Sequence, residues 1–258
     1  MRPYFEYYTA NLDRWPIELG VDLALIEKAP IAGLTHRVHL RLNLNHPTAD
    51  GLCCQEESAL LLAVEEEILS SLPKDSFCYV AHVTHRGRRT IILYMDGMPQ
   101  PGQPLLDAVE RVETHTTLLQ FEEDPEWKEY LEYLYPSEGF RHQIKDRRVL
   151  KEFERRGDDP ARNHSIEPVF SGLDEQGALE LRKALESVGF MVGDVANVSN
   201  NGVTSWRVIG KVKSPLALSI LDDYREIWMA LAKEQGGHYD GWSAEVLPIG
   251  EGDGPASQ

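Results

Sequence analysis

Histidines and cysteines are the first residues to weigh as metal ligands or nucleophiles in this chain. His36 and His39 are three residues apart in a segment expected to be a strand, and so are His82 and His85. Side chains three apart on a strand point to opposite faces, so neither pair can chelate one metal ion. The adjacent cysteines at 53–54 diverge and have no Cys-x-x-Cys partner. The sequence therefore predicts no metal site and no cofactor.

Carboxylate clusters are the second candidates for chemistry. Glu65-Glu66-Glu67 lies in an expected helix, where consecutive residues face different directions, so two of the three should face solvent. Glu122-Glu123-Asp124 ends an expected strand and predicts a solvated edge or a helix cap rather than an acid-base pair. The chain contains no Gly-x-Ser-x-Gly, no phosphate-binding glycine loop and no His-Glu-x-x-His. We expect a protein without catalysis.

The charge of the chain limits its partners. The 258 residues carry a formal net charge of −16, which repels a phosphate backbone, so direct binding of nucleic acid is not expected. Residues 138–156 differ, with an excess of about three positive charges. This segment contains a basic strip, Arg147, Arg148, Lys151 and Arg155. The strip is either a solvated helix face that complements acidic neighbours in the same molecule or a docking surface for an acidic partner.

Two further properties bear on location. No apolar run approaches the roughly 18 residues of a membrane helix, and residues 1–6 lack the apolar stretch of a signal peptide. The number of cysteines is odd, which predicts reduced thiols rather than a disulfide framework. We expect a cytoplasmic protein with no membrane partner.

The second half of the chain has a clear order of expected elements. They are a strand at 165–170, a helix from Ser171 or Asp174 to Gly189, hairpin strands at 190–198 and 203–212 around Asn200-Asn201-Gly202, a helix opened by Ser214-Pro215 and ended by Gly236-Gly237, and a last strand from Tyr239. This β-α-β-β-α-β order is that of a ferredoxin-like α+β sandwich.

The first half has the same order behind an additional hairpin. Its expected elements are hairpin strands at 4–12 and 15–23, a strand at 37–44, a helix at 55–71, hairpin strands at 77–85 and 88–95, a helix at 105–112, a strand at 115–122 and a capping helix that contains Trp127 and Leu134. Pro136 disfavours helix continuation. We expect two ferredoxin-like sandwich modules, one at 1–137 and one at 138–258, with a basic linking helix at 138–157.

The most distinctive motif is the C-terminal run His238-Tyr239-Asp240-Gly241-Trp242. In a regular strand Tyr239 and Gly241 share one face, while Asp240 and Trp242 share the other, with Trp242 in a core. Gly241 permits a bulge or a close backbone approach, and Asp240 can accept hydrogen bonds from loop amides.

Together with two upstream segments, this run carries a family resemblance. The segments are 144–150, Ile-Lys-Asp-Arg-Arg-Val-Leu, and Gly157-Asp158-Asp159. With the C-terminal run they resemble the ribonuclease E inhibitor B-like family of bacterial regulators, although Ser243 stands where that family usually has a further glycine. The resemblance implies inhibition of an endoribonuclease by protein contact.

Four short motifs of the first half carry a second resemblance. They are Val21-Asp22-Leu23, Asp50-Gly51-Leu52, Asp124-Pro125-Glu126-Trp127 and Leu134-Tyr135-Pro136. They resemble an uncharacterised bacterial domain family that is often fused ahead of the inhibitor-like domain. The motif residues expected to be structural are Trp127, Tyr135, Pro136, Gly241 and Trp242.

These observations predict a non-catalytic interaction or regulatory protein of two domains. Its partner is then a protein, a ribonuclease if the resemblance extends to activity, contacted by the basic strip and by exposed edges near Tyr239 and Asp240. One alternative is an enzyme or small-ligand-binding protein with a cleft between the modules. The residues expected to line that cleft are Trp127, Tyr135, His142 and Tyr239. The other alternative is a structural role, in which sheet edges join two copies into a homodimer.

Overall fold

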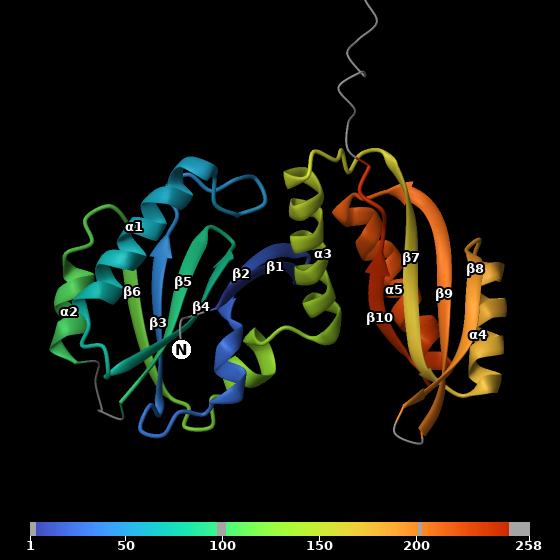
Figure 1. Cartoon of the computed structure of the whole chain (residues 1–258). Helices are drawn as coiled ribbons and strands as arrows, with labels where there is room; N and C mark the ends of the chain where they lie inside the picture. The colour runs from blue at the N-terminus through green and yellow to red at the C-terminus, as the bar shows by residue number, and fades with distance from the viewer. Residues whose placement is uncertain (1–3, 97–101, 201–202, 248–258) are drawn as a thin grey trace, which may run out of the picture. The chain divides into compact units, whose positions relative to one another are not determined.

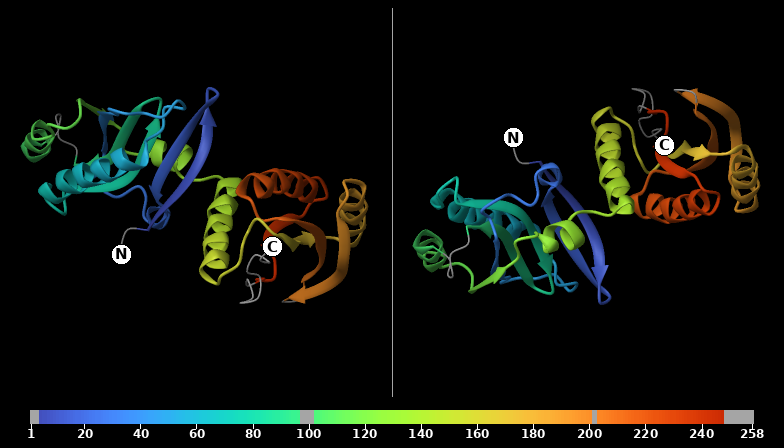
Figure 2. Two further views of the ribbon diagram at one scale, coloured as in Figure 1. Left: turned by 90° about the horizontal axis from the view of Figure 1, so that it is seen from above. Right: turned by 90° about the horizontal axis from the view of Figure 1, so that it is seen from below.

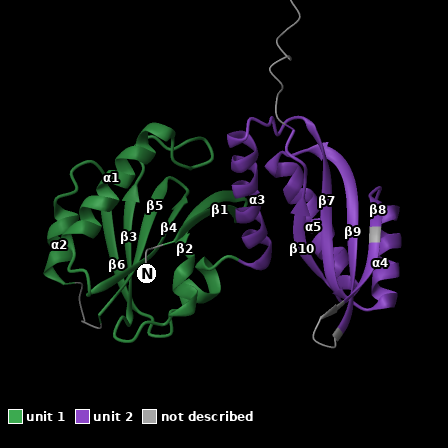
Figure 3. Cartoon of the chain, in the orientation of Figure 1, with its two compact units in different colours: residues 1–136 green, residues 137–258 purple. Residues whose placement is uncertain are grey.

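The chain folds as two units, each around one antiparallel sheet. The computed structural model describes residues 4–96, 102–200 and 203–247. Unit 1 is Met1–Pro136 and unit 2 is Ser137–Gln258 (Figure 3). In the described ranges, no helix has the length and apolar character needed to cross a membrane.

Unit 1 is built on a six-stranded sheet (Figure 1). Its elements are β1 (Phe5–Leu12), β2 (Trp15–Asp22), a 3-10 turn (Leu23–Glu27), β3 (His36–Asn43), α1 (Gln55–Ser71), β4 (Phe77–His85), β5 (Arg88–Met95), α2 (Gln103–Glu110), β6 (Thr117–Glu123) and a π-helical turn (Glu129–Leu134). The strand order is β1-β2-β4-β5-β3-β6, and every neighbouring pair is antiparallel.

Helices α1 and α2 cover one face of this sheet (Figure 1). On β3 the apolar residues Val38, Leu40 and Leu42 are fully buried, because alternate residues of a strand share a face. They belong to one core with Leu61 on α1 and Leu105 on α2. The intervening residues at 37, 39 and 41 therefore face away from the helices.

Unit 2 is built on a four-stranded sheet in the order β10-β7-β9-β8. Its elements are α3 (Glu138–Arg155), β7 (Asn163–Leu173), α4 (Glu175–Ser187), β8 (Met191–Asn200), β9 (Val203–Pro215), α5 (Leu218–Glu234) and β10 (His238–Ser243). Phe153 on α3, Leu181 on α4 and Trp228 on α5 all pack in one core with Phe170 on β7. Figure 2 gives two further views, in which α4 and α5 lie on the same side of the sheet.

Both units contain the predicted β-α-β-β-α-β order. It is β3-α1-β4-β5-α2-β6 in unit 1 and β7-α4-β8-β9-α5-β10 in unit 2. In both sheets the first and third strands of this order are adjacent and lie between the second and the fourth. The predicted α+β class is confirmed, and the hairpin of β1 and β2 extends the first sheet beside β4.

One predicted helix start is wrong. The sequence predicts that Ser214-Pro215 opens a helix, but β9 continues through Pro215 and pairs there with β7, with Ser214 opposite His164. Proline is tolerated at the end of a strand, and α5 begins only at Leu218. The predicted turn at Asn200-Asn201-Gly202 includes residues 201–202, which lie outside the described residues.

The final strand contains a β-bulge between Tyr239 and Gly241. Gly241 has a φ of 129°, a conformation that favours glycine, so the predicted bulge is confirmed. The extra residue exchanges the two faces of the strand for the residues that follow it. Tyr239 lies opposite Phe170 and Trp242 lies opposite Pro168, two alternate residues of β7. The prediction that Tyr239 and Trp242 point to opposite faces is therefore wrong, and both pack against the same core.

Candidate functional site

Helix α3 positions the basic strip of unit 2. Asp146, Leu150 and Phe153 are buried and recur at helical spacing, so they attach one side of the helix to the core. Arg148, Lys151 and Arg155 are exposed at a spacing of three and four residues, which places them along another side. Arg147 is half-buried, so it is the least accessible member of the strip.

The end of α3 contains its own counter-charge. The Glu152 carboxylate accepts hydrogen bonds of 2.7 Å from Arg155 Nε and Nη2 and from Arg156 Nε. These bonds lower the pKa of Glu152 to about 2. Arg155 is thus already engaged in an exposed ion pair, an interaction that contributes little to stability. Lys151 forms no ion pair with a carboxylate within the part of the chain that the structure describes, so its charge is more available to a partner.

Tyr239 is buried, contrary to the prediction that it lies at an exposed edge. Its side chain is 4% exposed and lies among the rings of Phe170, Trp228 and His142, with centroid distances of 5.8, 5.4 and 4.8 Å. Burial raises the pKa of its hydroxyl. Asp240 is exposed and accepts a hydrogen bond of 3.0 Å from Ser171 Oγ.

A buried carboxylate joins the two distant motifs of unit 2. Asp146 on α3 accepts hydrogen bonds of 2.7 Å from Arg225 Nη1 on α5 and from Trp242 Nε1 on β10. Arg225 also pairs with Asp222, which accepts from Gln143 Nε2 at 3.2 Å. Burial raises the pKa of Asp146, although the bonds from Trp242 and Arg225 oppose the shift. The contact is internal and ties three elements together.

The third motif of unit 2 is also internal. Asp158, just after α3, accepts from the backbone N–H of Leu247 at 2.7 Å and contacts His164 Nε2 at 3.0 Å. Burial alone would raise the pKa of Asp158, but these hydrogen bonds outweigh it and the pKa lies below its ordinary value. All three motifs that carry the resemblance of unit 2 thus hold loops and helices to the sheet.

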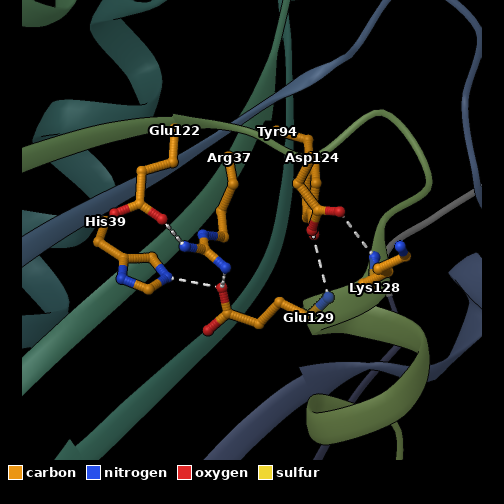
Figure 4. Close-up of polar contacts among 7 residues, drawn as sticks. All are labelled: Arg37, His39, Tyr94, Glu122, Asp124, Lys128 and Glu129. Carbon is orange, nitrogen blue, oxygen red and sulfur yellow. Dashed lines mark hydrogen bonds and ion pairs between the residues drawn. The ribbon is translucent and has the colours of Figure 1, made fainter.

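In unit 1, an ion-paired cluster lies on the sheet face away from α1 and α2 (Figure 4). Arg37 on β3 pairs with Glu122 on β6 and, at 2.8 Å, with Glu129 on the π-helical turn. His39 Nε2 lies 2.8 Å from the same Glu129 oxygen. Arg37, Glu122 and Glu129 all have their ionic partners inside the cluster, so these ion pairs hold the turn against β3.

Asp124 is the second centre of this cluster (Figure 4). It accepts from Tyr94 Oη at 2.5 Å and from the backbone N–H groups of Lys128 at 2.9 Å and Glu129 at 3.2 Å. Burial opposes ionisation, but these donors prevail and hold the pKa of Asp124 below its ordinary value. Asp124 thus satisfies helix-terminal N–H groups, as the sequence predicts for a cap.

Trp127 is part of the core of unit 1. It is fully buried, stacks on Tyr94 at 4.1 Å and donates from Nε1 to the Leu34 carbonyl at 2.7 Å. Tyr135 donates its backbone N–H to the Tyr130 carbonyl at 2.8 Å, and Pro136 ends the unit. Trp127 and Tyr239 are therefore each buried against residues of their own unit.

Sequence reasoning missed a buried polar network between α1 and the sheet of unit 1. Glu65 is 6% exposed and contacts Tyr79 Oη, His82 Nδ1 at 3.2 Å and Arg89 Nη1 at 3.7 Å. Burial would raise the pKa of Glu65, but these partners lower it below its ordinary value. One signal was available, because Glu65 occupies the helical stripe of Leu61 and Ile68.

Glu66 and Glu67 are exposed, as predicted for two of the three glutamates. Within the described ranges, no group of three or more His, Cys, Asp or Glu side chains could hold a metal ion. Cys53, Cys54 and Cys78 are free thiols.

Comparison with known proteins finds one matching family model in each unit. The family described as "Family of unknown function (DUF695)" matches residues 5–135, and the family described as "Regulator of ribonuclease activity B" matches residues 143–244. None of the curated proteins matches the chain significantly. A solved structure described as "Crystal Structure of an Unknown Protein from Galdieria sulphuraria" is 12% identical, covers 82% of this chain and 99% of that chain, and has a TM-score of 0.24.

Proposed function

Since this chain belongs to the DUF695 family of unknown function and its second unit matches the Regulator of ribonuclease activity B family, we propose that it regulates a ribonuclease by direct protein contact, without catalysis of its own. The match begins in the first half of α3, at residue 143, and runs to residue 244, just after β10. A ribonuclease partner implies action in the cytoplasm.

The observation that carries this proposal is the position of the basic strip within the matched unit. Arg148, Lys151 and Arg155 are exposed on a helix whose other side is fixed in the core by Asp146 and Phe153. The backbone of the strip is therefore already ordered when a partner binds, and only the side chains lose freedom. In a protein of net charge −16, a local positive surface favours an acidic patch on the partner. Such charges mainly accelerate association and make it salt-dependent.

The test measures RNA cleavage by purified ribonuclease E with and without the full-length protein. We expect the wild-type protein to lower the cleavage rate and to form a complex with the enzyme in sedimentation. The variant Arg148→Glu with Lys151→Glu should bind at least tenfold more weakly and with a smaller dependence on salt, because both side chains are exposed.

The matched control is Arg182→Glu with Lys183→Glu on α4. These residues are also exposed, and their reversal changes the net charge by the same amount. It should leave inhibition intact. Equal weakening by both variants would show that net charge alone acts, and the absence of both complex and inhibition with the wild-type protein would refute ribonuclease regulation.

A further inference from the structure

We propose that unit 1 binds a small phosphorylated organic anion in a hollow on the sheet face away from α1 and α2. The hollow has a volume of about 330 Å³, and its lining includes Arg41, Arg86, Arg88, His85, Ile17 and Val83. It is named the arginine hollow below. The inference concerns a different unit from the basic strip and does not depend on ribonuclease regulation.

Strand alternation places the centre of the hollow on the uncovered face. Arg41 lies on β3 between Leu40 and Leu42, which are buried beneath the helices, so Arg41 points the other way. Thr90 on β5 lies opposite Arg41, and Val83 on β4 lies opposite Thr90. Paired residues of antiparallel strands project to the same side. These three side chains therefore form one row across the sheet.

A second row lies two residues farther along, at the hairpin end of β4 and β5. Arg88 is opposite His85, and His85 is opposite Ile17 on β2. His85 Nδ1 donates to the Pro16 carbonyl at 3.1 Å, which fixes the ring and leaves Nε2 as its second polar atom. The two rows therefore place Arg41 of β3 and Arg88 of β5 in the lining of the same hollow.

The positive charges of the hollow have no carboxylate partner in the described ranges, 4–96, 102–200 and 203–247. Arg41, Arg86 and Arg88 form no ion pair with a carboxylate among the residues that the structure describes. Other arginines on the same strands do so. Arg37 on β3 pairs with Glu122 and Glu129, and Arg89 on β5 pairs with Glu65. Residues 1–137 have a net charge of about −11, so acidic partners are plentiful. The hollow thus gathers three arginines that have no carboxylate partner among the described residues.

The turn that carries Arg86 is held in place. Gly87 donates its N–H to the Gly51 carbonyl at 2.8 Å, and its own carbonyl accepts from the Leu44 N–H at 2.8 Å. A Cβ on Gly51 would lie 2.9 Å from Arg86 Cα, so the two loops are in close contact. The Arg86 guanidinium lies 5.7 Å from the Trp15 ring centroid, a cation-π distance. The Asp50-Gly51-Leu52 motif thereby supports one wall of the hollow.

These features select a phosphorylated small molecule. Planar guanidinium groups bind phosphate oxygens in pairs of hydrogen bonds, which a single ammonium cannot do. Leu12, Ile17 and Val83 supply an apolar wall for the organic part. The volume lies at the lower end of the range for small-molecule sites, roughly 300 to 1,000 Å³. An RNA strand is disfavoured, because a chain of net charge −16 repels a polyanion beyond the hollow.

The experiment titrates the full-length protein by calorimetry with four probes: adenosine 5′-monophosphate, ribose 5-phosphate, inorganic phosphate and adenosine. We expect one site for the phosphorylated organic compounds and at least tenfold weaker binding of adenosine. Amide and indole NMR shifts should change at Gly87 and Trp15 and stay constant in unit 2. Arg41→Gln with Arg88→Gln should weaken binding at least tenfold, whereas Arg41→Lys with Arg88→Lys, which keeps the charge, should weaken it less.

The matched control is Lys74→Gln with Arg111→Gln, two exposed residues of unit 1 outside the lining. It should bind like the wild type. The proposal is overturned if this control loses as much affinity as the Arg41 and Arg88 variant, if adenosine binds as well as its monophosphate, or if no phosphorylated probe binds at millimolar concentration. Tighter binding of a ten-nucleotide RNA than of the monophosphate would also overturn it, in favour of a nucleic-acid surface.

Discussion

Asp146 and Trp242, which are 96 residues apart in the sequence, share a partly buried hydrogen bond of 2.7 Å from the indole Nε1 to the carboxylate. The bond joins α3 to the edge strand β10, and Arg225 on α5 donates to the other carboxylate oxygen. A bulge before Trp242 is required for this contact, because without it the indole would project from the opposite face of the strand.

Removal of the indole donor should destabilise unit 2. Trp242→Phe keeps an aromatic ring but leaves one Asp146 oxygen without its donor, at a cost of about 1 to 3 kcal/mol. Asp146→Asn removes one of the two carboxylates that pair with the buried Arg225, and Asp222 remains, so a loss of about 1 to 3 kcal/mol is expected. Urea unfolding followed by circular dichroism measures both values, and the double variant should show non-additivity of about 0.5 to 3 kcal/mol.

The control for this prediction is Trp15→Phe, the same chemical change at a tryptophan that is 40% exposed. It should alter the free energy of unfolding by less than about 0.5 kcal/mol. If Trp242→Phe proves equally neutral, the hydrogen bond to Asp146 is not a significant source of stability.

The order of elements could be predicted from the sequence because its signals are local. Alternation along residues 37–44 and the Arg86-Gly87 turn each act within a few residues, and β3 and the β4-β5 hairpin follow them closely. The side on which Trp242 lies could not be predicted. It depends on one inserted residue in β10, and a slip of one residue exchanges the two faces of a strand.

Sites that combine residues far apart in the chain could not be predicted from the sequence for a different reason. Arg41 and Arg88 line one hollow only because β3 lies beside β5, a neighbour relation that alternation within either strand does not encode. The buried role of Glu65 likewise depends on His82 and Arg89 across the core, although its place in an apolar stripe was a usable signal.

Three adjacent glutamates give a direct test of the Glu65 network. Glu65→Gln removes the carboxylate charge opposite the buried Arg89, so we expect a loss of about 3 to 5 kcal/mol in the free energy of unfolding. Glu66→Gln makes the same chemical change at an exposed position and should cost less than about 0.5 kcal/mol. Thermal and urea unfolding measure the stability of both variants. Similar values for both variants would mean that the network does not hold α1 to the sheet.

Gly51 and Gly33 form a second matched pair. Both have positive φ, 72° and 90°, so alanine at either position meets the left-handed strain of about 1 to 2 kcal/mol. Only at Gly51 would the new Cβ also press on the Arg86 backbone, whereas nothing lies within 4 Å at Gly33. Gly51→Ala should therefore lower the melting temperature more than Gly33→Ala and shift the Gly87 amide resonance. Equal effects would show that the two loops are not in close contact.

Asp124 should make the stability of unit 1 depend on pH. Its pKa in the folded protein lies below the ordinary value of 3.8, because the donors Tyr94, Lys128 and Glu129 stabilise the carboxylate more than burial opposes it. A depressed pKa contributes stability above the ordinary value, and this contribution disappears as the pH falls through the folded value. Asp124→Asn should cost about 1 to 3 kcal/mol at pH 7. The difference in the free energy of unfolding between this variant and the wild type should narrow as the pH is lowered from about 5 toward 3.

The control is Asp75→Asn, at an exposed position, whose free energy of unfolding in urea should follow that of the wild type across the same pH range. A constant difference for Asp124→Asn would mean that its carboxylate titrates alike in the folded and unfolded protein.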